Sequence, residues 1–542
     1  MSDNADRLVV LALEIYEPGI SDDGTTFLVE VDGPQVAHRI SAGGPLEKRL
    51  AAEFWDRFEG AVPSKSALID ALAVLEGMAH RAKPVKVYRR IAQVGETIFL
   101  DLGDPVGHTV EITASGWRIL SKSPVLFWRS KLSGVLPVPE SGGSIDELRP
   151  LLNCDDDQFL LVIGWCVSYF HESLQQPVLG VFGEHGTAKT TLAGIIVDLT
   201  DPSPARLTSP SRSARDWSVH ASNRQVIVVD NVSEISQTES NYWCRAVTGE
   251  AFATRQLWTD GEVYFMAFRR SLIITGIGPR LRGDLADRTL RIDLAPIDSG
   301  RRKSQTEIQA TFEKMWPKLL GALLDLVAAS LGHIGQVGLL DLPRMADHAL
   351  VLGALDLAIP GSGYLDSFAR AADRILVETI DDDEVAAAVL DFAIREGHWS
   401  GTATVLYTRI SPRKPARGWP RTPQHLSRRL GEAAPGLRTV GVDIQWDREG
   451  AKGTRTIRIE YSEPSSGSSG PSGSSVAPPE KTLVEAVADD PDDADDAVRD
   501  LPSIGITLEG ALDSLKQPGE TFDEMLQRRH EESQDESEDE EE

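Results

Sequence analysis

The sequence contains little cysteine, and this excludes several classes of protein. Its three cysteines, Cys154, Cys166 and Cys244, are scattered along 542 residues, and no two of them form a C-x-x-C pair. An odd number of unpaired cysteines argues against a disulfide framework and against a zinc knuckle. The composition suits a reducing cytoplasm.

Targeting and membrane signals are also missing. The first ten residues, MSDNADRLVV, lack a basic segment followed by an apolar one, so no signal peptide is expected. The most apolar stretches, such as 319–335, are interrupted by charge at Asp325 and are shorter than the roughly 18 apolar residues of a membrane span. No internal repeat is evident. We therefore expect a soluble, cytoplasmic protein without membrane contact.

Charge is distributed unevenly. The chain has a net charge of −28, and residues 462–542 hold 24 acidic and 5 basic residues, a net −19. This segment begins SEPSSGSSGPSGSS and ends DESEDEEE, which is typical of a flexible linker followed by a disordered acidic tail. The rest of the chain carries only −9, so it is expected to be an ordinary globular body of several domains.

The amino-terminal part of the body divides into two regions. Residues 1–85 are predicted to be α-rich, starting with a strand in RLVVLALEIYE and continuing with helices at 45–59 and 64–81. Residues 86–144 contain short β-type runs separated by glycine turns, and they end in the connector LPVPESGGS. An α+β amino-terminal region is therefore expected.

The rest of the body has an α/β pattern followed by a smaller domain. Between 145 and 345, buried apolar runs alternate with helices, which predicts a mostly parallel sheet. A helical connector or lid is expected at 346–381. Residues 382–461 carry helices and then two strands joined at DREGAKGT, the pattern of a winged helix.

One loop in the α/β region has the composition of a phosphate-binding site. In GVFGEHGTAKTTLAG, Gly183, Lys189 and Thr190 fit the P-loop pattern G-x-x-x-x-G-K-[ST], and an apolar strand precedes the loop while a helix follows it. The backbone N–H groups of such a loop surround phosphates. The residues expected to contact nucleotide are Gly183, Glu184, His185, Gly186, Thr187, Ala188, Lys189, Thr190 and Thr191.

Ala188 stands where the pattern has its second glycine. If this position needs a positive φ, the added methyl group costs on the order of 1 kcal/mol, and if φ is negative it costs almost nothing. Neither outcome abolishes a site that several N–H donors and a lysine build. The alternative is a chance glycine-rich turn before a helix.

A second strand, RQVIVVDN, places Asp230 at its end, 41 residues after Lys189. Together with the Thr190 hydroxyl, a carboxylate there would hold Mg²⁺, as in a Walker B motif. The usual neighbouring glutamate is replaced by Asn231, and Glu234 is the nearest carboxylate that could substitute for it. Nucleotide binding is therefore better supported than fast hydrolysis.

The order of these motifs resembles that of AAA+ ATPases, specifically the compact superfamily 3-like helicase module of phage and plasmid primase-helicases. Within that group it is most similar to the actinobacterial and phage ATP-binding proteins. The resemblance covers roughly 86–380, and loosely matching flanks extend it over the whole body up to 461. The segments that carry it are DLGDPVGHTVEITASGWRI, GEHGTAKTT, VVDNVSEI, WCRAVTGEAFATRQLWTD, DLADRTLRIDL and LPRMADHAL. It implies a P-loop AAA+ core, ATP and Mg²⁺ as cofactors, DNA as a partner, and a homo-oligomer such as a hexamer.

The resemblance also implies roles for single residues. Lys189 and Thr190 would bind nucleotide and Mg²⁺, and Asp230 would be the Walker B acid. Thr275 would occupy the sensor 1 position, which is usually asparagine. Arg288 looks like an arginine finger that acts on the neighbouring subunit, the alternative being a simple ion pair with Asp287 or Asp284.

Three further residues have weaker assignments. Arg344 is either a sensor 2 arginine or part of an ion pair at a helix start. Arg255 and Trp258 lie on a segment that would form a hairpin facing a central pore, although buried packing of Trp258 is the alternative.

The predicted winged helix would be the DNA-binding element. Thr422 can cap a helix that begins with Pro423, and basic residues follow on the helix, the preceding loop and the wing. The candidate DNA contacts are Arg413, Lys414, Arg417, Arg421, Arg428, Arg429, Lys452 and Arg455. The alternative is a solvated basic face on a protein-binding winged helix.

The predicted function is an ATP-dependent DNA helicase or remodelling ATPase of the phage or mobile-element replication type. Two alternatives stay open: a nucleotide-switched DNA-binding scaffold with little turnover, and a defence or signalling ATPase that senses nucleic acid. No primase-type acidic cluster lies upstream, so polymerase activity is not expected. The acidic tail either competes with DNA for the basic surface, binds a partner or, as in most such tails, is simply solvated.

Overall fold

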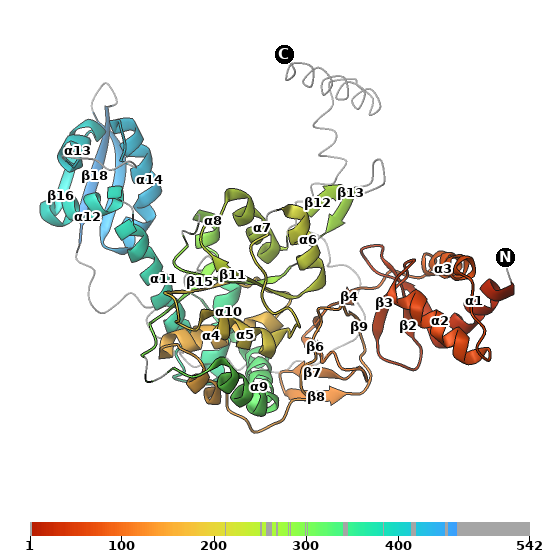
Figure 1. Cartoon of the computed structure of the whole chain (residues 1–542). Coiled ribbons are helices and arrows are strands. Elements are labelled where there is room, and N and C mark those ends of the chain that lie inside the picture. The colour runs from red at the N-terminus through yellow and green to blue at the C-terminus, as the bar shows by residue number, and fades with distance from the viewer. Residues whose placement is uncertain are drawn as a thin grey trace, which may run out of the picture. The chain divides into compact units, whose positions relative to one another are not determined.

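Figure 1 shows a computed structural model of the whole chain. The chain divides into two compact units at Ser474 and Ser475. The residues that the structure describes all belong to the first unit: 3–211, 213–249, 252–255, 263–266, 269–279, 281, 283–298, 300, 302–339, 345–382, 384–412, 419–449 and 454–462. The predicted acidic tail therefore lies outside the described residues, apart from its first residue.

The amino-terminal region contains both helices and strands. Its elements are α1 (Asp3–Ile15), β1 (Tyr16–Ile20), β2 (Thr26–Glu30), β3 (Val36–Arg39), α2 (Pro45–Arg57) and α3 (Lys65–Ala79). The strand predicted for RLVVLALEIYE is wrong, because most of this segment is helix α1. Ala5, Leu8, Leu11 and Ala12 recur at helical spacing and are buried, and α1 packs against α3.

The next region is built from short strands. They are β4 (Val87–Tyr88), β5 (Ile91–Val94), β6 (Thr97–Asp101), β7 (Thr109–Thr113), β8 (Gly116–Leu120) and β9 (Leu126–Trp128). Strands β5 to β8 form an antiparallel sheet, whereas β9 and β4 join the first sheet in the order β1-β2-β3-β9-β4. A buried ion pair, Arg90 Nε to Asp201 Oδ1 at 2.9 Å, connects this region to the α/β region.

The α/β region contains the parallel sheet that the sequence predicts. Its four strands are β10 (Val178–Gly183), β11 (Val226–Val232), β14 (Ser271–Gly276) and β15 (Thr289–Leu294). They are ordered β11-β14-β10-β15, and every pair is parallel. A separate antiparallel hairpin, β12 (Phe252–Arg255) and β13 (Val263–Met266), precedes β14.

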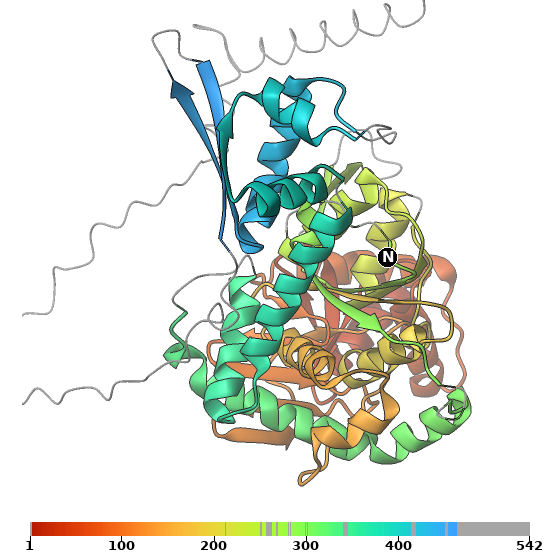
Figure 2. The ribbon, with the colours of Figure 1, turned by 90° about the vertical axis from the view of Figure 1, so that its left-hand side faces the viewer.

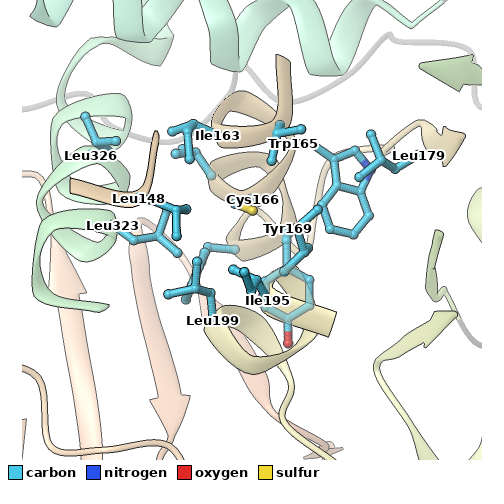
Figure 3. Packing of buried hydrophobic residues seen from close by; sticks show 14 of the residues in the cluster. Leu148, Ile163, Trp165, Cys166, Tyr169, Leu179, Ile195, Leu199, Leu323 and Leu326 are labelled. Carbon is cyan, nitrogen blue, oxygen red and sulfur yellow. The ribbon is translucent and has the colours of Figure 1, made fainter. Parts of the chain in front are cut away.

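Helices surround this sheet. They are η1 (Ile145–Leu151), α4 (Asp156–Phe170), α5 (Lys189–Thr200), α6 (Ala214–Asn223), α7 (Gln237–Thr248), α8 (Gly283–Ala286), α9 (Gln305–His333), η3 (Ile334–Gln336), α10 (Ala346–Ala358) and α11 (Tyr364–Asp382). In Figure 3, Cys166 of α4 lies among Ile195 and Leu199 of α5 and Leu323 of α9, and Trp165 of α4 lies beside Leu179 of β10. This packing fixes α5, and with it the loop that precedes α5.

Helix α9, green in Figure 2, contributes to the main hydrophobic core. The stretch Gln305–Gln336 is long and apolar enough to cross a membrane by length and composition alone. Leu319, Leu320, Leu323 and Leu324 are buried and belong to the main core. A buried core helix passes the same length and composition test, so this stretch is weak evidence for a membrane span.

The carboxy-terminal domain combines three helices with a small sheet. Its elements are α12 (Glu384–Glu396), β16 (His398–Gly401), α13 (Ala403–Ile410), α14 (Pro423–Thr439), β17 (Val442–Glu449) and β18 (Thr454–Tyr461). The antiparallel strands are ordered β16-β18-β17 and pack over their own apolar core. The predicted cap is confirmed, since Thr422 Oγ1 accepts a hydrogen bond from the His425 N–H at 3.2 Å.

Candidate functional site

The loop between β10 and α5 has an unusual backbone. Gly183 and Gly186 have positive φ, and Ala188 adopts the left-handed conformation with φ 66° and ψ 26°. For an alanine this conformation costs roughly 1–2 kcal/mol. The structure thus places Ala188 in the more costly of the two conformations that the sequence left open.

The strain in this loop has a counterpart on β11. Among the described residues, three that are not glycine have positive φ: Glu59, Ala188 and Asn231. Two of these, Ala188 and Asn231, lie at the carboxyl ends of parallel strands in one sheet, where α/β proteins place their sites. Strained backbone persists where the surrounding structure enforces it, and it clusters at functional sites.

The loop is held from both sides. A Cβ atom on Gly183 would lie 2.6 Å from the Leu294 carbonyl oxygen at the end of β15, so only glycine fits there. Asn153 Nδ2 donates to the carbonyl oxygens of Thr187 at 3.2 Å and Ala295 at 2.7 Å. The Thr187 side chain is fully buried and donates to the Glu184 carbonyl at 3.0 Å, so this residue supports the loop from inside.

Lys189 is the first residue of α5 and its side chain returns over the loop. Its ammonium group donates to the carbonyl oxygens of Gly183 at 2.8 Å and Glu184 at 2.6 Å. Burial lowers the pKa of Lys189, and the negative charge of Asp230 opposes this effect. The ammonium group therefore rests on the loop carbonyls, within electrostatic range of the Asp230 carboxylate.

Side chains from α5 and β14 converge on Asp230 of β11. The Thr190 hydroxyl of α5 donates to Asp230 Oδ1 at 3.2 Å, and the Thr275 hydroxyl of β14 donates to the same oxygen at 2.5 Å. Thr275 is 1% exposed, and its hydroxyl also accepts the backbone N–H of Asn231 at 3.1 Å. The structure therefore brings Lys189, Thr190, Asp230 and Thr275 together.

The oxygen ligands of this cluster suit one type of ion. Mg²⁺ is usually bound by one or two carboxylates together with substrate phosphates and retained waters. Asp230 and the Thr190 hydroxyl offer such hard oxygen ligands, and Lys189 offers a charge for phosphate. Within the described part of the chain, no group of three or more His, Cys, Asp or Glu side chains could hold a metal ion. The residues thus fit a magnesium–nucleotide complex better than a metal site made of protein ligands alone.

Arg288 lies at the other end of the sheet. Its carbonyl oxygen accepts the Val178 N–H where β10 and β15 begin, whereas the loop follows Gly183, whose register partner is Leu294. Six residues at about 3.3 Å each separate the two ends by roughly 20 Å. Arg288 Nε donates to both carboxylate oxygens of Asp284 at 3.2 Å. Arg288 is thus outside its own chain's loop site and takes part in one of the ion pairs considered as the alternative.

One arginine near the loop is not singled out by the sequence. Arg302 is exposed, and its Nη2 lies 3.9 Å from the position that a Cβ on Gly186 would occupy. Its Nε donates to the Ile297 carbonyl at 3.3 Å. The basic run at 301–303 is visible in the sequence, but no motif spacing connects it to the loop.

Glu234, the expected substitute carboxylate, is exposed in the segment that follows β11.

Several predicted site residues lie outside the described residues: Trp258, Arg344, Arg413, Lys414, Arg417 and Lys452. Arg255 is the last residue of β12 and pairs with Val263 in the hairpin. Whether this hairpin faces a pore stays a prediction.

The other candidate DNA contacts lie in the carboxy-terminal domain. Arg421 and Arg455 are exposed, and Arg455 pairs in register with Arg448 across the β17–β18 hairpin. On α14, the Arg428 side chain is 70% exposed and that of Arg429 is 30% exposed, and each lies 3.8 Å from Glu432. The sequence interpretation missed Trp446, an exposed indole on β17.

Together these features define an α/β protein with a candidate site at the carboxyl edge of a parallel sheet. Residues 145–380 match the family model of the actinomycete integrative conjugative element replication protein, and residues 385–474 match the model of the carboxy-terminal domain of that family. The two matches indicate a replication protein of this type.

Solved structures show only distant likenesses. The apo structure of the NrS-1 C-terminal region is 13% identical with a TM-score of 0.39, and the match covers 84% of this chain and 98% of that one. The X-ray structure of JCV helicase is 13% identical with a TM-score of 0.21, covering 40% and 66%. TM-scores this low carry no functional conclusion. No curated protein matches the sequence.

Proposed function

We propose that this replication protein is an ATP-dependent DNA helicase or remodelling ATPase that works as a homo-oligomer in the cytoplasm. The observation that carries the proposal is the convergence of Thr190, Asp230 and Thr275, with Lys189 beside them. In P-loop ATPases, a lysine, a hydroxyl and a carboxylate hold the phosphates and Mg²⁺ in this way.

Each residue has a definite part in the proposal. The loop from Gly183 to Ala188 would surround the phosphates with backbone N–H groups, and Lys189 would leave the loop carbonyls for the β- and γ-phosphates. Thr190 and Asp230 would hold Mg²⁺, which neutralises charge on the phosphates when bound. Thr275 is a positioning residue, since its hydroxyl orients the Asp230 carboxylate.

The strand order supports the AAA+ class within the P-loop proteins. Strand β14 lies between β10, which leads into the loop, and β11, which carries Asp230. This insertion places a polar side chain, Thr275, between the loop and the carboxylate. A sensor 1 residue needs such a position to respond to the nucleotide.

Two features support action on DNA by an oligomer. The order of helices and strands in 384–461, with the β17–β18 hairpin in the position of a wing, supports a winged helix, and exposed Arg421, Arg428 and Arg455 suit phosphate contacts. The distance of roughly 20 Å between Arg288 and its own loop is compatible with the proposed role toward a neighbouring subunit.

The decisive experiment measures ATP turnover of the full chain with and without single- and double-stranded DNA, alongside its mass in solution. We expect turnover that DNA stimulates, an oligomer, and loss of ATP binding in Lys189→Ala. An unchanged ATP affinity in Lys189→Ala would overturn the nucleotide site.

One observation favours a second candidate. Asn231 replaces the carboxylate that usually polarises the attacking water, and its backbone is fixed in a left-handed conformation with φ 59°. Tight ATP binding with negligible turnover, with or without DNA, would identify a nucleotide-switched DNA-binding scaffold. The family match to a replication protein weighs against the third hypothesis, a sensing ATPase in defence.

A further inference from the structure

A large cleft opens at the end of the parallel sheet that lies opposite the candidate nucleotide site. Its volume is about 1110 Å³, and its wall includes Ser271, the first residue of β14, and Gln225, which directly precedes β11. Further walls come from β3, β4 and β9 and from the end of α4.

The cleft is rich in positive charge. Seven arginine and lysine residues line it, against the three acidic residues Asp22, Asp23 and Glu172. The body of the protein outside the tail has a net charge of −9, so this concentration runs against the background. Arg129 is already paired with Asp101 at 2.6 Å, and Lys86 is paired with Glu172, one of the three acidic residues of the wall, at 3.2 Å. The other five cations of the wall are Arg39, Arg89, Lys131, Arg269 and Arg270.

Part of the polar capacity of the cleft is unused. The hydroxyl of Tyr169, whose side chain is 4% exposed, and the Nε of Arg269 have no hydrogen-bond partner within the described part of the chain. Burial, and after it the charge of Arg89, lowers the pKa of Arg270 to about 9, although Asp201 and Glu172 act in the opposite direction. An anion in the cleft would stabilise the protonated Arg270 guanidinium.

Two aromatic rings in the cleft wall lie beside cations. Lys86 Nζ lies 4.5 Å from the ring centre of Tyr88, and the Arg39 guanidinium lies 5.8 Å from that of Trp128. Tyr88 and Trp128 are both half-buried in the cleft wall. A positively charged groove with aromatic rings is the arrangement that binds single-stranded nucleic acid, because the cations follow the phosphates and the rings stack on bases. An acidic peptide would use the cations alone.

We propose that this cleft binds single-stranded DNA, with its phosphates on Arg39, Lys86 and Lys131 and a base against Tyr88. The choice of DNA as the polymer rests on the proposed replication function. Arg269 and Arg270 directly precede β14, and Thr275 lies near the other end of that strand. The same strand therefore connects the cleft to the carboxylate of the nucleotide site.

The test uses the full chain and a fluorescent oligonucleotide of about 20 thymidines, a length that spans typical single-strand sites. Arg39, Lys86 and Lys131 are exposed, so replacing all three with glutamine should leave the fold intact. We expect at least a tenfold loss of affinity at about 0.1 M salt, and a salt dependence whose log–log slope falls by about 2, since each lost contact contributes roughly 0.7.

The matched control removes the same charge elsewhere. Lys48, Arg57 and Lys65 are exposed and lie outside the cleft wall, and the three corresponding glutamine substitutions should change the affinity by no more than about twofold. Tyr88→Ala should weaken binding about fivefold or more without changing the salt slope, because stacking releases no counterions.

Other outcomes would overturn the proposal. One is equal loss of affinity in the cleft and control variants. Another is a cleft variant that keeps its oligonucleotide affinity but no longer binds a peptide of residues 531–542. That result would identify an acidic segment as the occupant of the cleft. A third is loss of single-strand binding in Arg428→Glu/Arg429→Glu but not in the cleft variant. ATP turnover without DNA should persist in the cleft variant, so failure of this proposal is distinguishable from failure of the ATPase assignment.

Discussion

The hydrogen bond from Thr275 to Asp230 gives the sharpest test of the nucleotide site. Thr275→Val keeps a branched side chain of similar shape but removes the hydroxyl that donates to Asp230 Oδ1 and accepts the Asn231 N–H. A hydrogen bond to a charged group contributes about 1.5–3 kcal/mol. If that energy orients the carboxylate for Mg²⁺, ATP turnover should fall by roughly 10- to 150-fold.

The assay compares Thr275→Val with Thr275→Ser. Serine retains the hydroxyl and loses only a methyl group, so it should keep most of the turnover. Mg²⁺-dependent ATP affinity should fall in the valine variant, whereas affinity measured with chelator present should change little, because the hydroxyl acts through Asp230. Turnover in Thr275→Val equal to that of the parent protein would refute the positioning role.

Three other predictions follow from the same region. Ala188→Gly should relieve roughly 1–2 kcal/mol of left-handed strain, but it should lose about 0.4–1 kcal/mol of folding stability because glycine makes the unfolded chain more flexible. The two effects partly offset each other, so a binding titration should show that ATP affinity changes less than about tenfold. Arg288→Ala should bind ATP but hydrolyse it poorly, and mixing it with Lys189→Ala should restore part of the turnover; no recovery in proven mixed oligomers would count against a finger acting between subunits. Arg302→Ala should weaken ATP binding about tenfold through loss of a charge-assisted contact, while the neighbouring Lys303→Ala should not; equal effects would mean that Arg302 makes no specific contact.

Parts of the candidate site and of the fold could be predicted from sequence because their determinants are local. The spacing of glycine, lysine and threonine, the apolar run that ends at Asp230, and the cap at Thr422 each depend on residues close together in the chain. Hydrogen bonds within a loop or a first helical turn need little help from the rest of the protein. The parallel sheet could be predicted for a similar reason, because its strands are continuous apolar runs between helices.

Long-range packing decided the features that the sequence did not reveal. The segment at 7–17 is apolar enough for a strand, but α1 buries the face whose apolar residues recur at helical spacing against α3, α2 and β1. The left-handed backbone of Ala188 is held where Gly183 meets the end of β15. Arg302 approaches Gly186 because β15 returns the chain to the loop.

The basic cleft shows most clearly the difference between features that local sequence determines and features that long-range packing determines. Its cations come from segments more than 200 residues apart, such as Arg39 and Arg269, and no sequence pattern connects them. In this protein the sequence by itself determined which residue types surround a nucleotide, because that motif is contiguous. Only the tertiary structure decided which charges share a cleft, because strand pairing between β3 and β9 and the packing of α4 bring those segments together.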